Sequence, residues 1–439
     1  MGKFLFTTLP SNDLGLLTRS LPLAHELRTR GHHIVFCSPA PAPSRLIAEA
    51  GLTNLRPRDP FYALVSGDFR PTTFAHLLRA PRAAFKLALL TGFARQMLRL
   101  TSEIWHMDHF IALLGGQNEN FVQLNVELLV SLIEETQPDA VVDFWNPFAC
   151  LAARVAQKPL ITVIQADMHP LSQGFIWWKP PPPHLPTALP AFNRVRHTFG
   201  LPPLHGISDL FLGDQTLLLG TPETDPLPPH AAGTYIGPIL WQSPKENLPA
   251  WVESPPPAPP LIWVYSGNPR YAPGVRTAFD SSVVLSACIE ALRDEPVRVA
   301  LSTGHHLLPR KFLPLPDNFH YAPYLPGLAM AERSALLVHH GGYGSCQTGL
   351  YTGTPALILP TYSERESNAR RVAALGAGEM LLPEIGNGGK KTVSPLEFRA
   401  KVRQLLSTPA YKENAMNIRE KLRRYGGPAQ AADLILAAL

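Results

Sequence analysis

The sequence predicts an α/β protein built from two Rossmann-like, doubly wound parallel sheets, and three observations carry this prediction. Residues 3–37 read as a buried strand, a glycine-containing turn, an amphipathic helix and a second buried strand, which is the order of a parallel βαβ unit. From residue 261 onward, short apolar strands again alternate with turns and helices. Between the two halves, residues 241–260 are polar and then proline-rich, as in a stiff linker.

The length and composition fit this division. A chain of 439 residues is long enough for two domains of about 200 residues each, and we expect them at 1–240 and 261–410, with closing helices at 411–439. The net charge of +5 is too mild to indicate nucleic acid. The four cysteines form no CxxC pair, so neither a zinc site nor a disulfide framework is indicated. No signal peptide or apolar run of membrane-spanning length is present, so a cytoplasmic protein is expected.

Apolar runs predict the elements of the first domain in order. Lys3–Thr8 reads as the first buried strand, and Leu16–Arg30 as an amphipathic helix that contains Pro22. Further buried strands are expected at His33–Cys37, Ala140–Asp143, Pro159–Gln165 and Gln215–Gly220.

Two longer segments of this domain do not read as strands. Residues 61–136 are helical and irregular, and their basic part, 75–100, either lies on a membrane surface or packs among the other helices. Peripheral membrane contact therefore stays open. Residues 168–204 form a proline-rich segment that carries Trp177 and Trp178. Tryptophans between rigid prolines suit the apolar wall of a binding site or a lid, and the alternative is a surface segment packed on its own domain.

The second domain shows the same alternation. Strands are expected at Leu261–Tyr265, Val297–Ser302, Phe319–Tyr321, Ala335–Val338 and Ala356–Leu359. An amphipathic helix is expected at Leu396–Leu406, and closing helices at Asn414–Arg424 and Ala429–Leu439. After the first of these strands comes the turn Ser266-Gly267-Asn268, which suits a phosphate group because it lies at the carboxyl end of a parallel strand.

The stretch most indicative of a ligand begins at His339. A buried strand ends there, and His340-Gly341-Gly342-Tyr343-Gly344-Ser345 leads directly into a short helix. Backbone N–H groups at a helix N-terminus are unpaired and the helix dipole is positive there, so an anion is favoured. Glycines allow close approach of a phosphate, and His340 can add a donor or a positive charge. The alternative is a tight strand-to-helix turn without a ligand.

Fixed spacings around this turn resemble the donor motif of bacterial family 1 glycosyltransferases, which use UDP- or TDP-sugars and have the two-domain GT-B fold. Pro326, His340, Gly353-Thr354-Pro355, Pro360 and Asn368 fall at the family's spacings. The resemblance implies two domains that face each other across a cleft. The acceptor would bind to the first domain and the nucleotide sugar to the second.

The resemblance also implies residue roles. His340, Gly344 and Ser345 would hold the pyrophosphate, and Tyr324 would stack on the base. Glu364 stands where the family has a sugar-binding aspartate, and Arg365 replaces the neighbouring glutamine, which leaves the donor sugar open. Asn368 is expected to cap the next helix. The complete expected donor site is Gly267, Asn268, Tyr324, Leu325, His340, Gly342, Gly344, Ser345, Glu364 and Arg365.

One departure concerns the acceptor-activating histidine. The pattern LA..L..RGH at 23–32 resembles the opening of the family, but the position of the histidine is occupied by Leu16. Asp13, in the preceding turn, is a candidate general base, and its alternative role is to form the turn or cap the helix. Asp143 resembles the family's strand-end aspartate, although the residue spacing of the family's motif would place that aspartate one position later, at Phe144. Its alternative role is also a helix cap.

These observations predict an inverting transfer of a sugar from a nucleoside diphosphate sugar, with UDP expected, to a hydroxyl of a small apolar acceptor. The resemblance implies no metal and no cofactor besides the donor substrate, and it leaves the oligomeric state open. Trp177 and Trp178 are the expected acceptor contacts. The competing prediction is a GT-B partner protein that binds the nucleotide sugar but has lost its base; a nucleotide-sugar epimerase or hydrolase ranks third.

Overall fold

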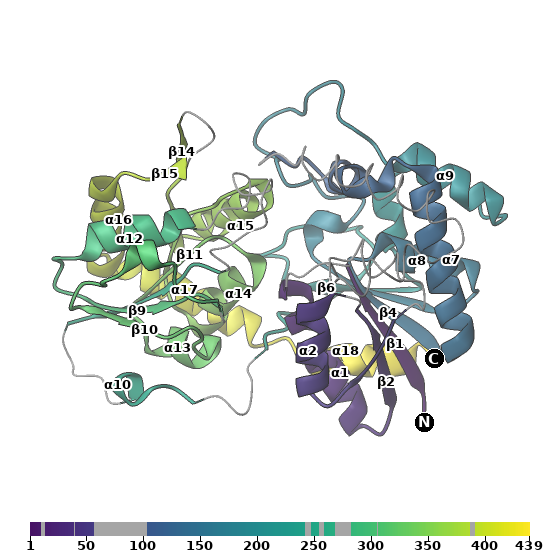
Figure 1. Ribbon diagram of the computed structural model, residues 1–439, viewed down its shortest axis with the longest axis horizontal. Helices are drawn as coiled ribbons and strands as arrows, with labels where there is room; N and C mark the ends of the chain where they lie inside the picture. Colours follow the sequence, from purple (N-terminus) through teal and green to yellow (C-terminus); the bar gives the residue numbers. More distant parts are fainter. Residues whose placement is uncertain are drawn as a thin grey trace.

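The computed structural model describes residues 1–9, 14–38, 40–56, 103–241, 247–253, 259–267, 282–304, 306–386 and 391–439. Two parallel sheets, each covered by helices on both faces, form two lobes that lie side by side (Figure 1). The basic segment 75–100 lies outside the described residues. No helix in the described ranges is long and apolar enough to cross a membrane.

The first sheet has seven parallel strands in the order β3-β2-β1-β4-β5-β6-β7. The chain order reverses between β1 and β4, which are paired with Thr7 opposite Asp143. Ligands of open parallel sheets bind beyond the carboxyl ends of the strands at such a reversal. The strands are β1 (Lys3–Thr8), β2 (His33–Cys37), β3 (Thr53–Leu55), β4 (Ala140–Phe144), β5 (Leu160–Ile164), β6 (Gln215–Leu219) and β7 (Thr234–Gly237).

Alternation along β1 fills both faces of this sheet, because successive side chains of a strand point to opposite faces. Phe4 and Phe6 belong to the core with α1 (Gly15–Thr29) and α18 (Pro428–Ala437). Leu5 belongs to the opposite core with α7 (Glu119–Thr136), α8 (Pro147–Val155) and α9 (Leu189–Thr198). The remaining helical elements of this domain are α2 (Pro41–Glu49), α6 (Met107–Ile111), η1 (Ala112–Gly116), η2 (Ala166–Met168) and η3 (Ile207–Phe211).

The second sheet has six parallel strands in the order β10-β9-β8-β11-β12-β13, with its reversal between β8 and β11. Its strands are β8 (Leu261–Tyr265), β9 (Arg298–Ser302), β10 (Phe319–Tyr321), β11 (Leu336–His339), β12 (Ala356–Ile358) and β13 (Gly378–Met380). The helices that follow these strands or close the domain are α12 (Ser282–Leu292), α13 (Gly327–Arg333), α14 (Tyr343–Thr352), α15 (Ser363–Ala374), α16 (Pro395–Ser407) and α17 (Pro409–Leu422); the turn η4 (Arg310–Phe312) and the hairpin β14 (Glu384–Ile385) and β15 (Lys391–Thr392) complete it.

The segment between the domains differs from a uniformly extended linker. A short helix, α10 (Ala250–Glu253), forms within it. Val252 is fully buried in the core of the second domain, and Trp251 stacks on His320 with ring centroids 4.8 Å apart. The apolar side chains of this segment therefore anchor it to the second sheet.

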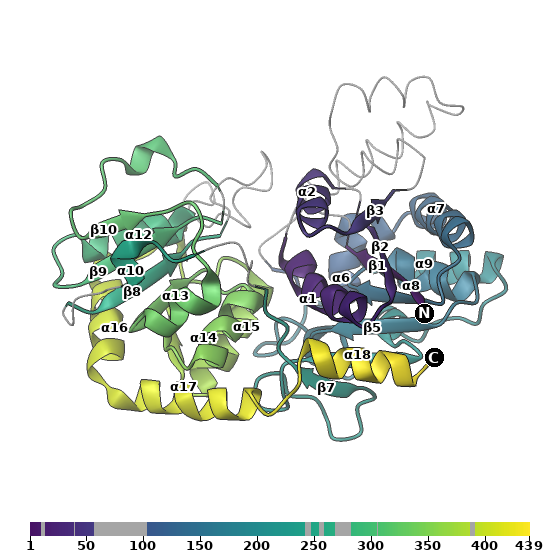
Figure 2. The same ribbon diagram turned by 90° about the horizontal axis from the view of Figure 1, so that it is seen from below.

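The last helix of the chain returns to the first domain (Figure 2). At the crossing, the N–H of Gly427 donates to the carbonyl of Ile236 at 2.8 Å. Ala431, Ala432 and Ile435 are fully buried against α1 and the first sheet. Helix α18, which follows the second domain in the chain, thus packs on the first domain through apolar contacts and ties the two domains together.

Candidate active site

The reversal point of the second sheet gathers a glycine-lined cradle around His340. Strands β8 and β11 are neighbours, so Gly267 and His340, which follow their carboxyl ends, meet there. A Cβ added to Gly267 would come within 2.9 Å of the His340 ring, and one added to Gly342 within 2.8 Å. The imidazole is thus enclosed by backbone at two positions where only glycine fits without a shift.

Burial also decides the charge of His340. Its side chain lies with 8% of the residue exposed, and its Nδ1 has no hydrogen-bond partner among the described residues. Burial, followed by the nearby charge of Arg365, lowers the pKa of His340 well below its ordinary value. The imidazole is therefore neutral near pH 7, so its free ring nitrogen is a hydrogen-bonding group and does not carry the positive charge that the sequence left open.

Helix α14 starts beside this ring and has an open N-terminus. Gly342 is its N-cap residue, no side chain of the described chain caps it, and its first turn contains no acidic residue. A Cβ added to Gly344 would meet no described atom within 4 Å. Space for a ligand therefore coincides with the uncapped N-terminus of α14 at Gly344, next to His340, whereas the N–H of Ser345 already donates to the carbonyl of Gly342 at 3.0 Å.

Helix α15 contributes the expected sugar-binding carboxylate. Glu364 is 9% exposed, and its Oε1 accepts a 2.8 Å hydrogen bond from Nδ2 of Asn368, which also donates to the carbonyl of Gly341 at 3.1 Å. Asn368 thus lies inside α15 and joins it to the glycine turn, so the expectation that it caps a following helix is wrong. Burial raises the pKa of the Glu364 carboxyl.

Arg365 is buried rather than part of a surface salt bridge. Only 4% of the residue is exposed, its Nη1 donates to Oγ1 of Thr361 at 2.6 Å, and its guanidinium lies 4.7 Å from the centre of the Tyr362 ring. Its charge is felt at Glu364 and at His340. It is therefore placed among the expected donor residues, and its effect on the choice of sugar stays a prediction.

Two other expected donor residues lie farther along the sheet. Tyr324 and Leu325 follow β10, which is separated from β11 by β9 and β8. Leu325 is 3% exposed and packs in the core, whereas Tyr324 is half-buried. Tyr324 is thus the one of the pair that can present its ring to a base. Asn268 lies outside the described residues.

Of the two candidate bases, Asp13 lies outside the described residues and Asp143 is buried in the first sheet. Asp143 has no exposed surface; its oxygens accept hydrogen bonds from Thr7 Oγ1 at 2.5 Å, the N–H of Asn146 at 3.0 Å and Cys150 Sγ at 3.2 Å. Burial raises its pKa to about 7. These contacts make Asp143 a structural carboxylate in this conformation, and its catalytic role stays a prediction. Leu16, in the first turn of α1, is half-buried.

Trp177 and Trp178 pack across the domain boundary, against α15. The Nε1 of Trp177 donates to Oγ of Ser367 at 3.1 Å, and the guanidinium of Arg370 lies 4.2 Å from the centre of the Trp178 ring. The alternative that this segment packs only on its own domain is therefore wrong. Because Ser367 is one helical turn from Glu364, the tryptophan segment and the expected sugar-binding residue share one helix.

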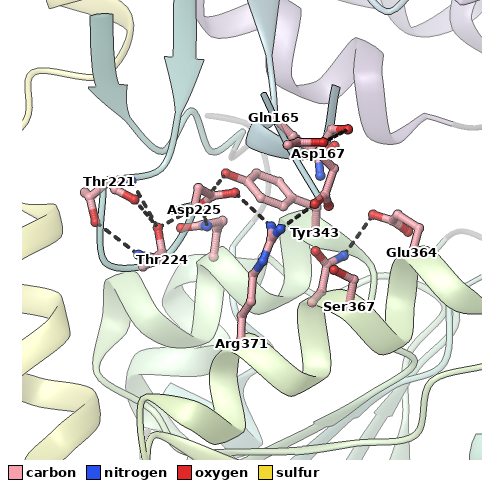
Figure 3. Close-up of polar contacts among 12 residues, drawn as sticks. Gln165, Asp167, Thr221, Thr224, Asp225, Tyr343, Glu364, Ser367 and Arg371 are labelled. Atoms are coloured by element: carbon pink, nitrogen blue, oxygen red, sulfur yellow. Dashed lines mark hydrogen bonds and ion pairs between the residues drawn. The ribbon is translucent and has the colours of Figure 1, made fainter. Parts of the chain in front are cut away.

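A buried ion-pair network at the same boundary was not predicted (Figure 3). Arg371 of α15 binds Asp167, which follows β5, and its Nη1 lies 3.6 Å from Oδ1 of Asp225, which follows β6. Asp225 also accepts hydrogen bonds at 3.1 Å from the Tyr343 hydroxyl and from Nε2 of Gln347. Burial raises the pKa of Asp225 to about 6, against the opposing effect of Arg371. The sequence shows that Asp167 and Asp225 come just after buried strands, but no feature of the sequence indicates that Arg371 is their partner.

Within the described ranges, no group of three or more His, Cys, Asp or Glu side chains is arranged to hold a metal ion. The polar groups that meet at the boundary are the helix N-terminus, the neutral imidazole and the buried carboxylates. Such a set suits hydrogen bonding to an anionic, hydroxyl-bearing ligand.

Comparison with known proteins gives the family. Residues 291–437 match the family described as Erythromycin biosynthesis protein CIII-like, C-terminal domain. The whole chain superimposes on the spinosyn rhamnosyltransferase SpnG with a TM-score of 0.67 and 18% identity, covering 100% of this chain and 99% of that one. Residues 291–437 therefore belong to that family, and the whole chain has the two-domain GT-B fold.

Curated relatives match this chain over part of their length. The protein named "Uncharacterized UDP-glucosyltransferase YojK" of Bacillus subtilis is 32% identical over 152 residues, which is 35% of this chain and 36% of the relative. A PGL/p-HBAD biosynthesis rhamnosyltransferase of Mycobacterium bovis is 28% identical over 334 residues, which is 67% of this chain and 70% of the relative. The matches to the first three relatives span 36%, 42% and 37% of their lengths.

Proposed function

We propose that this chain is a bacterial family 1 glycosyltransferase that transfers a sugar, with inversion at the anomeric carbon, from a nucleoside diphosphate sugar to a hydroxyl of a small apolar acceptor. The observation that carries the proposal is the cradle formed by Gly267, His340 and Gly342 at the open N-terminus of α14. Such a site would bind a diphosphate. Glu364, on the neighbouring helix α15, would bind the sugar attached to that diphosphate.

The named functions of similar proteins support the same assignment. The relative YojK is named a UDP-glucosyltransferase, and solved structures show SpnG in complex with thymidine diphosphate and with a spinosyn aglycone. We propose UDP as the nucleotide of this chain, with TDP as the alternative to be compared directly. Natural-product glycosylation is the class of reaction proposed.

The reaction would run as an in-line displacement. The acceptor hydroxyl attacks the anomeric carbon while the bond from that carbon to the diphosphate oxygen breaks, and the electron pair stays on the departing nucleoside diphosphate. The N-terminus of α14 and the neutral His340 would stabilise the charge that builds on this oxygen. Hydrogen bonds from the sugar hydroxyls to Glu364 would orient the donor, and Asn368 fixes that carboxylate at 2.8 Å.

The proton of the acceptor must go to a base other than residue 16, because Leu16 cannot accept it. We propose Asp13, which lies between β1 and α1 in the sequence. Asp143 is the second candidate, and its complete burial and three internal hydrogen bonds count against direct contact with an acceptor. Trp177 and Trp178 would supply apolar surface for the acceptor beside α15.

A thermal-shift titration with UDP, TDP and GDP, followed by transfer assays with the corresponding glucose donors and a panel of phenols, tests the proposal. We expect stabilisation by UDP or TDP and formation of a glycoside. Stabilisation without transfer to any acceptor would favour the alternative of a nucleotide-sugar-binding partner protein. Absence of stabilisation by any nucleotide would refute the donor site, and His340→Ala serves as the variant in which nucleotide affinity should fall.

A further inference from the structure

An arginine of the first domain lies against the first residue of the helix that forms the donor site. Arg19, in the second turn of α1, has its guanidinium carbon 5.1 Å from the centre of the Tyr343 ring. Tyr343 is the first residue of α14. A positive charge from one domain is therefore held against the ring of the residue that begins α14 in the other.

The position of this guanidinium is set by its neighbours. Its Nε donates to the carbonyl of Gly15 at 2.8 Å, and its Nη1 donates to Oε1 of Gln165, beyond β5, also at 2.8 Å. Both partners lie at the carboxyl edge of the first sheet, the edge that faces α14 and α15. Arg19 is half-buried, so it is restrained while part of its surface stays accessible.

The charge of Arg19 reaches the donor residues of the second domain. Burial raises the pKa values of Tyr343 and Glu364, and the positive charge of Arg19 acts in the opposite direction on both. A cation that is felt at the first residue of α14 and at Glu364 lies within range of the groups between them. Those groups are the ones that would contact a diphosphate and the attached sugar.

Two further observations indicate that an anion belongs at this place. The Nδ1 of His340 is without a hydrogen-bond partner among the described residues, although the residue is more than nine-tenths buried. A Cβ on Gly344 would meet open space among the described atoms. An unpaired ring nitrogen and open space thus lie at the start of α14, and the first residue of that helix carries the guanidinium of Arg19 against its ring.

We propose that Arg19 binds the diphosphate of the donor from the first domain and stabilises the nucleoside diphosphate as it leaves. This inference rests on the proposed function. When the bond between the anomeric carbon and the diphosphate oxygen breaks, the added negative charge on that oxygen is shared by α14 and Arg19, and the acceptor's proton leaves to the base. Because the two groups come from different domains, bound diphosphate would bridge the domain boundary.

Isothermal titration calorimetry with UDP and uridine, and with TDP and thymidine, tests this role. We expect Arg19→Gln to bind the diphosphate that the wild type prefers at least about tenfold more weakly, since a hydrogen bond between charged groups is lost. The nucleoside should bind as it does to the wild type. Arg28→Gln is the matched control, because Arg28 lies on the same helix but donates to the carbonyl of Gly51 on the surface.

Further variants distinguish the loss of the positive charge at residue 19 from a failure of the variant to fold. Arg19→Lys should recover part of the lost diphosphate affinity, and Arg19→Met should repeat the loss if Arg19→Gln does not fold. An unchanged ratio of diphosphate to nucleoside affinity, an equal loss of both, or no recovery in Arg19→Lys would each overturn the inference. If the wild type and Arg19→Gln bound the diphosphate equally and both transferred sugar, the proposed function would stand and the proposed role of Arg19 would be refuted. If the wild type bound no nucleotide, both the proposed function and the role of Arg19 would be refuted.

Discussion

The hydroxyl of Tyr343 donates a 3.1 Å hydrogen bond to Oδ2 of Asp225. Tyr343 is the first residue of α14, yet its ring packs in the core formed by the first sheet and α18. Asp225 is fully buried beyond β6. The glycine turn that is proposed to bind the donor is therefore fixed directly to the domain proposed to bind the acceptor.

Removal of that hydroxyl tests how much the contact contributes. Tyr343→Phe should lower the free energy of unfolding by about 1 kcal/mol, because Asp225 keeps its bonds from Thr224 and Gln347 but loses one donor. Urea unfolding would measure this. Tyr351→Phe on the same helix is the control, since its hydroxyl has no hydrogen bond within the described part of the chain. Equal effects of the two changes would contradict the assignment.

Loss of Arg371 should have a larger effect. Arg371→Met leaves Asp167 and Asp225 buried without their cation, so we expect a loss of about 3–5 kcal/mol in the free energy of unfolding. The loss should be greater at pH 8 than at pH 5, because both carboxylates must ionise at the higher pH.

An exposed arginine provides the comparison. Arg403 pairs with Glu295 at 2.8 Å, and its side chain is 66% exposed. Arg403→Met should leave the free energy of unfolding almost unchanged, since solvent screens such pairs. Urea unfolding would measure both variants. An equal loss in the free energy of unfolding would contradict the expectation that burial makes the Arg371 ion pairs more important for stability.

Asp143 should impose a pH dependence on stability. Its pKa is raised to about 7 in the folded protein from an ordinary 3.8, so the folded state holds a proton that the unfolded chain releases first. This stabilising contribution is complete below about pH 4 and is lost as the pH rises to about 7, by at most about 1.4 kcal/mol per pH unit. Asp225, whose pKa is raised to about 6, acts with the same sign.

The measurement is the midpoint of urea unfolding between pH 5 and pH 8. Asp143→Asn should flatten the decline of stability with pH, because it cannot ionise. Asp214→Asn is the control: the Asp214 carboxyl binds Arg154 and has a lowered pKa, so its contribution is already constant in this range. A slope in Asp143→Asn identical to that of the wild type would contradict the raised pKa.

Two glycines of the donor turn should respond differently to alanine. Gly344→Ala adds a methyl group where no described atom lies within 4 Å, so stability should be unchanged or slightly raised while UDP affinity falls. Gly342→Ala brings a methyl group within 2.8 Å of the His340 ring and should lower both. Thermal unfolding and calorimetric titration would measure the two quantities. Wild-type affinity in Gly344→Ala would remove the diphosphate from that space.

The sequence by itself determined most of the buried strands, the first helix and the donor motif. Apolar periodicity placed β8 and β10 at their observed bounds and α1 within one residue at each end, because strands and amphipathic helices follow from local side-chain spacing. The turn from His339 to Ser345 was also recognisable, since glycine has a local conformational role. Gly341, for example, has a φ of 90°.

Only the tertiary structure decided which distant polar groups meet. Arg371 and Asp167 are 204 residues apart, and Arg19 and Gln165 are 146 apart, so no local pattern joins them. It also turned Asp143 toward Thr7 and Cys150, and it made His340 a neutral, buried donor or acceptor. Charge and hydrogen-bond partners depend on burial and on approach through space, which the fold sets and which local sequence spacing does not record.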